Sequence, residues 1–175
     1  MEESGFIASY VAFAPKKKKT LYRLSDYYTA FFFKFLKNGR DHGANAGINL
    51  IDHPRQRAWQ GFAFEQVCLD HVWFIEKALG ISGVQSNNVS WRGSTETRSA
   101  QIDLLTDRCD QVINLCECKF SLDNFLIDKE YTAKLRAKIA TFKSVTKTRK
   151  PVFLALVTSY GVDRNASRIS WCATR

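Results

Sequence analysis

The chain has 175 residues, of which 45% are hydrophobic and 25% charged, with only 9 Gly and 3 Pro. This composition is typical of a folded globular protein and excludes collagen-like, low-complexity and wholly disordered classes. Its 26 Lys and Arg residues against 17 Asp and Glu give a net charge of +9, which favours a polyanionic partner such as nucleic acid. The chain shows neither a long uncharged apolar run nor a secretory signal pattern, so we expect a cytoplasmic protein without a membrane span.

The first 57 residues are expected to form a unit separate from the rest of the chain. A β-prone segment over residues 5–13 and a strand-like segment over 21–24 flank a run of lysines at 16–19, and Ser25 can cap the helix that follows. Aromatic residues cover more than one face of this helix, so we expect it to be buried on several sides, against a core or a partner. The polar, glycine-containing residues 38–57 are the expected linker.

The remainder of the chain predicts an α/β domain. The patterns indicate a helix over residues 58–79 that ends at Gly80, a second helix over 128–145, and strands over 84–91, 100–107, 111–120, 152–158 and 168–172. This order predicts a mixed central sheet flanked by helices.

Two of these consecutive strands place acidic residues close together. A tight turn on residues 109–111 would set Asp103 directly opposite Glu117, and side chains two apart share a face, so Lys119 lies beside Glu117 and Gln101 beside Asp103. Facing carboxylates in an apolar setting repel each other and need compensation. A divalent cation such as Mg²⁺ supplies it, and Lys119 could position or deprotonate a water.

A simpler explanation for so short a pattern is a surface ion pair between Glu117 and Lys119. The neighbouring pair Cys116 and Cys118 lacks the second pair of ligands, or the spaced histidine, that a structural zinc site requires. Five scattered cysteines match no disulfide framework, so we expect reduced thiols.

Asp103 followed by Glu117-x-Lys119 resembles the core motif of the PD-(D/E)XK nuclease superfamily, whose members cut phosphodiester bonds with Mg²⁺ on a restriction-endonuclease-like fold. Four segments are more narrowly similar to the C-terminal nuclease-like domain of a group of prokaryotic AAA-type ATPases: residues 61–65, 90–92, 100–105 and 114–121. This similarity covers residues 58–160. Residues 3–26 are similar to the winged-helix tail and connecting helix that precede that domain.

The resemblance implies two domains: residues 1–57, a winged-helix tail with an aromatic connecting helix and a linker, and residues 58–175, a nuclease-like domain. It implies that Asp103, Glu117 and Glu65 hold Mg²⁺ or Mn²⁺, that Lys119 is the catalytic lysine, and that Gln101 supports the site. The superfamily's proline before the aspartate is replaced by Ile102. No phosphate-binding Gly-x-x-x-x-Gly-Lys-[Ser/Thr] loop occurs, so ATPase activity would need an upstream module.

The second helix carries the expected DNA-binding face. Basic residues recur every seven positions along it, and others add to them, so this face can bind phosphates without reading sequence. The residues in question are Lys129, Lys134, Arg136, Lys138, Lys143, Lys147 and Lys150. An ordinary solvated helix face is the alternative.

The acidic pair with Lys119, together with the resemblance, leads us to expect a metal-dependent deoxyribonuclease or a nuclease-like DNA-binding domain, and the resemblance implies that it forms the C-terminal portion of an AAA-type ATPase. Two alternatives stay open. One is a degenerate nuclease fold that tethers an ATPase to DNA or to a protein partner. The other is a transcription regulator that uses a winged-helix remnant, for which deletion of residues 1–57 would abolish DNA binding. The chain is compatible with a homo-oligomer.

Overall fold

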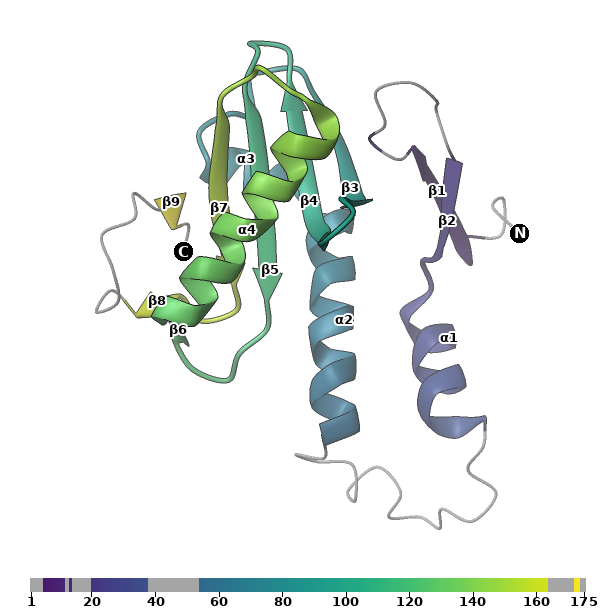
Figure 1. The fold of residues 1–175 in the computed structure, drawn as a ribbon. Helices are drawn as coiled ribbons and strands as arrows, with labels where there is room; N and C mark the ends of the chain where they lie inside the picture. The colour runs from purple at the N-terminus through teal and green to yellow at the C-terminus, as the bar shows by residue number, and fades with distance from the viewer. Residues whose placement is uncertain (1–4, 12, 14–19, 38–53, 164–171, 174–175) are drawn as a thin grey trace.

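A mixed sheet with helices on both faces forms the main body of the protein (Figure 1). The computed structural model describes residues 5–11, 13, 20–37, 54–163 and 172–173. The sheet order is β3 (Ser86–Ser94), β4 (Ser99–Arg108), β5 (Ile113–Lys119), β7 (Val152–Thr158) and β9 (Cys172–Ala173). Strands β3, β4 and β5 pair antiparallel, whereas β7 and β9 continue the sheet in parallel. The predicted α/β class is confirmed.

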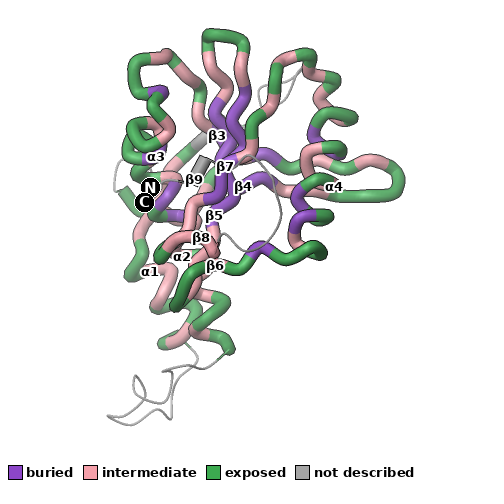
Figure 2. Tube along the Cα trace, turned by 90° about the vertical axis from the view of Figure 1, so that its left-hand side faces the viewer, coloured by how far each residue is buried: buried purple, intermediate pink, exposed green. Residues whose placement is uncertain are grey.

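Each face of the sheet has its own hydrophobic core. Helix α4 (Lys129–Thr146) covers one face, where Phe142 packs against Trp91, Leu105 and Leu115. Helices α2 (Pro54–Asp70) and α3 (Val72–Ala78) cover the other face, and Cys68 and Ile75 pack there. Figure 2 shows the buried segments concentrated along the central strands, with exposed surface on the outer helices.

The helical segment before the sheet is longer and more broken than the pattern predicts. Helix α2 begins at Pro54, because proline is favourable in the first helical turn, so residues 54–57 are helical and do not belong to a linker. The helix is interrupted at His71, which separates α2 from α3. Gly80 adopts φ +71° just after α3, which confirms it as the residue that ends the segment.

A tight hairpin joins β4 to β5, as predicted. The backbone N–H of Arg108 donates to the carbonyl of Val112 at 3.0 Å, which closes the loop over residues 109–111. Gln111 adopts the left-handed conformation with φ +67°, which a three-residue hairpin loop requires at its last position.

The N-terminal segment is a hairpin followed by a short helix. Strands β1 (Ile7–Val11) and β2 (Thr20–Leu24) pair antiparallel, and α1 (Tyr27–Phe31) continues into the π-helical turn η1 (Phe32–Leu36). The expected cap at Ser25 is wrong. Asp26 caps the helix by accepting the N–H of Thr29 at 2.6 Å, and the hydroxyl of Ser25 donates to the carbonyl of Gly5.

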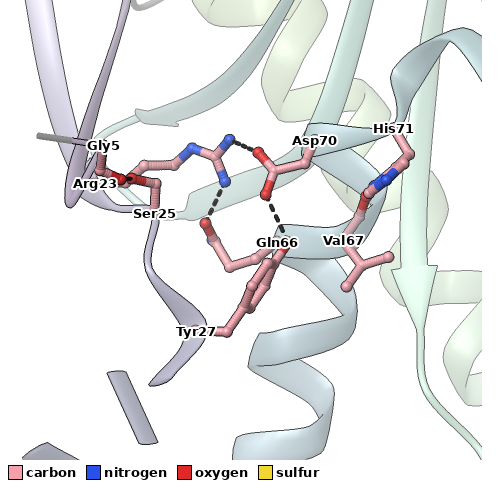
Figure 3. Close-up of polar contacts among 8 residues, drawn as sticks. All are labelled: Gly5, Arg23, Ser25, Tyr27, Gln66, Val67, Asp70 and His71. Atoms are coloured by element: carbon pink, nitrogen blue, oxygen red, sulfur yellow. Dashed lines mark hydrogen bonds and ion pairs between the residues drawn. The ribbon is translucent and has the colours of Figure 1, made fainter. Parts of the chain in front are cut away.

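Polar contacts fasten this segment to α2 (Figure 3). The guanidinium of Arg23 donates to Gln66 and Asp70, and the hydroxyl of Tyr27 donates to Asp70 at 2.5 Å. Burial and this hydrogen bond raise the pKa of Tyr27 to about 12. The segment and the sheet body therefore share a charged, hydrogen-bonded contact through Asp70.

The aromatic helix is only partly covered. Phe31 and Phe35 contact Trp59 of α2 with ring centroids 5.4 and 6.0 Å apart. Tyr28 is 69% exposed and Phe33 is 52% exposed. The described residues of this chain therefore cover one side of the helix only, and burial of the other side against a partner stays a prediction.

Two short strands complete the described fold: β6 (Phe125–Leu126) and β8 (Val162–Asp163), which pair in parallel. Three expectations fall wholly or partly outside the described residues: the lysine run at 16–19, most of the linker at 38–53, and most of the last strand at 168–171. Among the described helices, none is long and apolar enough to cross a membrane.

Candidate active site

Two acidic side chains are buried where β4 and β5 run side by side. Asp103 in β4 is 6% exposed, and Glu117 in β5 is 1% exposed. Both strands lie in the interior of the sheet, so apolar residues from both cores surround these acids. Acidic residues are seldom buried without a partner, because an unpaired buried charge is costly.

A β-bulge in β4 lies at Asp103. The pairing of β3 with β4 shifts register between Val89 and Trp91, which leaves one extra residue in β4 at positions 103–104. Ile102 and Leu105 consequently lie in the same core cluster although they are three residues apart. Bulges re-aim side chains and are common next to active sites.

The bulge also ends the ladder between β4 and β5. The last pair in that ladder is Leu104 with Cys116, in the register that the predicted turn requires. Asp103 therefore does not form the next ladder pair with Glu117. Its carboxylate instead accepts the backbone N–H of Cys118 at 2.9 Å, so a side-chain oxygen satisfies a donor at the end of the ladder.

Lys119, at the end of β5, lies between the two acids. Its Nζ is 3.9 Å from Oδ2 of Asp103 and 3.7 Å from Oε2 of Glu117. The sequence prediction that Asp103, Glu117 and Lys119 converge is confirmed at these distances. Lys119 remains partly accessible, with 29% of its side chain exposed, so solvent or a ligand can reach this end of the site.

A second lysine, Lys138 of α4, binds Glu117 more closely. Its Nζ lies 2.7 Å from Oε1 and 2.6 Å from Oε2 of the same carboxylate. The sequence analysis placed Lys138 on the expected DNA-binding face. In the structure its ammonium points toward the sheet and donates hydrogen bonds to both oxygens of Glu117. It supplies part of the compensation that the sequence assigned to a metal ion.

The surroundings of the site raise the pKa of two of its acids, Glu117 and Glu65. Burial raises the pKa of Glu117, and Asp103 raises it further, more than Lys138 and Lys119 lower it. Burial raises the pKa of Glu65 as well, with a further contribution from Asp103, so the α2 residue lies within electrostatic range of the acid pair.

Tyr131 of α4 adds a phenol that the sequence analysis did not identify. Burial raises its pKa, and the charges of Glu117 and Asp103 add to the effect, so the ring lies near both acids. Its hydroxyl is buried and has no hydrogen-bond partner among the described residues. Buried hydroxyls are normally paired, so this one can donate to a group that enters the site.

The donor set is compatible with a hard divalent cation. Mg²⁺ is commonly held by one or two carboxylates together with waters and substrate phosphates, and Asp103 and Glu117 provide two such carboxylates. Within the described ranges, no cluster of three or more His, Cys, Asp or Glu side chains is close enough to hold a metal ion. Glu65 is therefore near the pair without completing a three-ligand set.

Gln101 lies farther along β4. It pairs with Arg92 of β3 and lines a hollow of about 480 Å³ at the end of the β3–β4 hairpin. No described hydrogen bond connects its side chain to Asp103 or Glu117. Its predicted role in supporting the site remains a prediction.

The basic residues on and just after α4 divide into three groups. Three have carboxylate partners: Lys134 with Glu130 at 2.7 Å, Lys138 with Glu117, and Lys150, just beyond α4, with Asp107 at 2.6 Å. Lys129 and Arg136 instead line a hollow of about 510 Å³ together with Arg98 from the loop between β3 and β4. Lys143 and Lys147 are exposed near the C-terminal end of the helix.

No family model matches this chain, and no curated protein matches it. One solved structure that resembles part of it is the crystal structure of a protein of unknown function, AF1548. The two are 16% identical with a TM-score of 0.36, over 53% of this chain and 47% of AF1548. The match thus spans less than half the length of AF1548.

Proposed function

We propose that this chain carries a metal-dependent nuclease site that hydrolyses phosphodiester bonds. One observation carries the proposal: two buried carboxylates from adjoining strands converge on the same lysine, with Lys119 Nζ 3.7 Å from Glu117 and 3.9 Å from Asp103. The spacing of Asp103 and Glu117-x-Lys119 resembles the PD-(D/E)XK motif, and their convergence in space supports the same interpretation.

Asp103 and Glu117 would hold Mg²⁺ or Mn²⁺, and Glu65, which is within electrostatic range of both, would bind a coordinated water. The bound ion would polarise the phosphoryl oxygens and lower the pKa of a water. Lys119 stands beside both acids, so its ammonium can stabilise the charge that develops on the phosphate. Tyr131 can donate a hydrogen bond at the inner wall of the site, because its hydroxyl is buried without a described partner.

The narrower resemblance suggests the setting of this activity. On that basis we propose that the chain is the C-terminal portion of a prokaryotic AAA-type ATPase, with DNA as its substrate and the ATPase module upstream. The net charge of +9 is consistent with a nucleic-acid partner.

A second candidate is an inactive nuclease fold that binds DNA or a protein partner. Lys138 favours it, because an ammonium at 2.6 and 2.7 Å from the two oxygens of Glu117 compensates that acid without a metal ion. In this case the charged cluster would stabilise the fold, and the basic surface would do the binding.

Cleavage assays on the full chain distinguish the two candidates. Labelled single-stranded and duplex DNA would be incubated with Mg²⁺ or Mn²⁺, using the parent and the variants Asp103→Asn, Glu117→Gln and Lys119→Met. We expect each variant to lose at least about 100-fold in rate, since each removes a charged group from the reacting centre. Glu130→Gln, which alters a surface pair on α4, serves as the control and should retain activity.

Calorimetric titration with Mn²⁺ provides the second measurement. The parent should bind the ion, and Asp103→Asn should bind it at least about tenfold more weakly, because one of two carboxylate ligands is lost. A parent that binds no ion and cuts no DNA would exclude the nuclease and leave the inactive module.

A further inference from the structure

Two hollows flank the end of the β3–β4 hairpin, and only cationic charge lines them. The α4 hollow, about 510 Å³, has Arg98, Lys129 and Arg136 at its edges. The hairpin hollow, about 480 Å³, has Arg92 on its wall and reaches Gln101. The described residues that line either hollow include no carboxylate.

These four cations have no carboxylate partner within the described part of the chain. Arg92, Arg98, Lys129 and Arg136 are all exposed, whereas Lys134, on the same helix as two of them, is paired with Glu130. Unpaired cations gathered around a hollow make a positive potential that attracts anions. Because each can form charge-assisted hydrogen bonds, phosphate is the chemical group that fits them best.

The shape of the α4 hollow suits a chain of phosphates better than a single one. Lys129 and Arg136 are seven residues apart, which is about 10 Å along the helix axis. Ala133 lies between them on the helix, and Ala137 and Ala140 line the hollow just beyond Arg136. A ligand can therefore lie against the helix, with sugar rings over the alanine methyl groups and phosphates at the two cations.

Both hollows are lined by residues of the β3–β4 hairpin, whose strand β4 continues to Asp103. Arg98 lines the α4 hollow and the next residue, Ser99, lines the hairpin hollow. Gln101 lines the hairpin hollow as well, and Asp103 follows two residues later, roughly 7 Å along the strand. The hairpin thus connects a cationic surface on α4 to the candidate active site.

We propose that these hollows form a track for the phosphodiester backbone of a nucleic-acid strand, held by Arg92, Arg98, Lys129 and Arg136. The inference rests on the proposed function, because it assigns the path by which substrate reaches Asp103 and Glu117. It narrows the expected DNA-binding face: Lys134, Lys138 and Lys150 are committed to carboxylates, and Arg98 joins from outside the helix.

The test measures binding separately from cleavage. Fluorescence anisotropy of a labelled DNA strand would be recorded with the full chain in the absence of divalent cations, over a series of KCl concentrations. Arg98→Gln and Arg136→Gln should each weaken binding about tenfold, since each removes a charge-assisted contact. Each should also lower the slope of log affinity against log salt by about 1.

Lys134→Gln is the matched control, because Lys134 lies on the same helix but away from the hollow and is paired with Glu130. It should bind DNA as the parent does. An equal loss in Lys134→Gln, or no loss in either arginine variant, would overturn the track. Equal competition by polyglutamate or by anionic lipid vesicles would overturn the assignment to nucleic acid.

The outcomes separate this inference from the proposed function. A parent that binds DNA through Arg98 and Arg136 but never cuts it keeps the track and removes the nuclease. Cleavage by the parent with an unchanged KM in both arginine variants keeps the nuclease and removes the track.

Discussion

Two carboxylates and two ammonium groups meet at the candidate site, so its formal charge balances without a metal ion. Glu117 is bound by Lys138 through both oxygens, and Lys119 lies between Glu117 and Asp103. A divalent cation that binds Glu117 must therefore displace the ammonium of Lys138. That ammonium is free to leave, because 31% of the Lys138 side chain is exposed to solvent.

If Lys138 competes with the metal ion for Glu117, its removal should strengthen metal binding. Removal of its charge in Lys138→Met should raise the affinity for Mn²⁺ about tenfold, because the ion no longer displaces a charge-assisted hydrogen bond. Calorimetric titration of parent and variant measures the change. Lys134→Met, which removes a charge from the surface of the same helix, should leave the affinity unaltered. Weaker Mn²⁺ binding by Lys138→Met would mean that Lys138 helps to hold the ion instead of competing with it.

The sequence identified the acids and Lys119 at the residue scale because they are close in the chain and on consecutive strands. The contact of Lys138 with Glu117 could not be predicted, for a physical reason. It is 21 residues from Glu117, and its direction depends on how α4 is rotated over the sheet. The heptad spacing of basic residues indicated a helix face but gave no information on which members of that face turn inward.

Tyr131 carried no distinguishing signal, since an aromatic residue on a helix stripe usually packs in the core.

At the scale of elements, the β4–β5 hairpin offers a prediction on stability. Gln111 holds φ +67°, a conformation that costs a residue with a side chain roughly 1–2 kcal/mol and costs glycine little. Gln111→Gly should therefore raise the free energy of unfolding by about 1 kcal/mol. Urea denaturation of the parent, Gln111→Gly and Gln111→Ala measures it, and the alanine variant should show no gain. A loss of stability in Gln111→Gly would show that the contact between the Gln111 amide and the Cys109 carbonyl matters more than the backbone conformation.

The hairpin and the bulge differ in how far the sequence determines them. Local turn chemistry fixes the loop over residues 109–111, so the register between β4 and β5 could be predicted. The bulge at Asp103 depends on how β3 pairs with β4, and the alternation of apolar residues does not reveal it. The break at His71 between α2 and α3 is likewise invisible, because the helical spacing of apolar residues continues through it.

On the scale of the whole molecule, Asp70 links the N-terminal segment to the sheet body. Asp70→Ala removes the acceptor that binds both Arg23 and Tyr27. We expect faster hydrogen exchange in β2 and α1, with no change in β4 and β5, because the sheet does not depend on this contact. Hydrogen exchange followed by mass spectrometry measures it, with Asp123→Ala as a control at an exposed loop position. Unchanged exchange in α1 would show that the packing of Phe31 and Phe35 on Trp59 is sufficient to hold the segment.

The composition and the order of elements were sufficient to predict the class of the fold, because alternating strands and amphipathic helices leave few ways to bury both faces of a sheet. The contact between the N-terminal segment and α2 could not be predicted. It joins residues more than 40 positions apart through polar side chains, which carry no periodic signal.

The extra residue in β4 ties the candidate site to the integrity of the protein. Because of the extra residue, the alternation of side chains between the two faces of the sheet shifts by one position at residue 103. Ile102 on one side of the bulge and Leu105 on the other both face the core beneath α4. A deletion that straightened the strand would turn Ile102 away from Trp91 and Phe142 while it removed the acid. Deletion of a residue from β4 would therefore disrupt the core, whereas a substitution of Asp103 would remove the acid and leave the core packing in place. We therefore expect homologous chains that lack the acid to keep the bulge and to differ in the side chain at position 103.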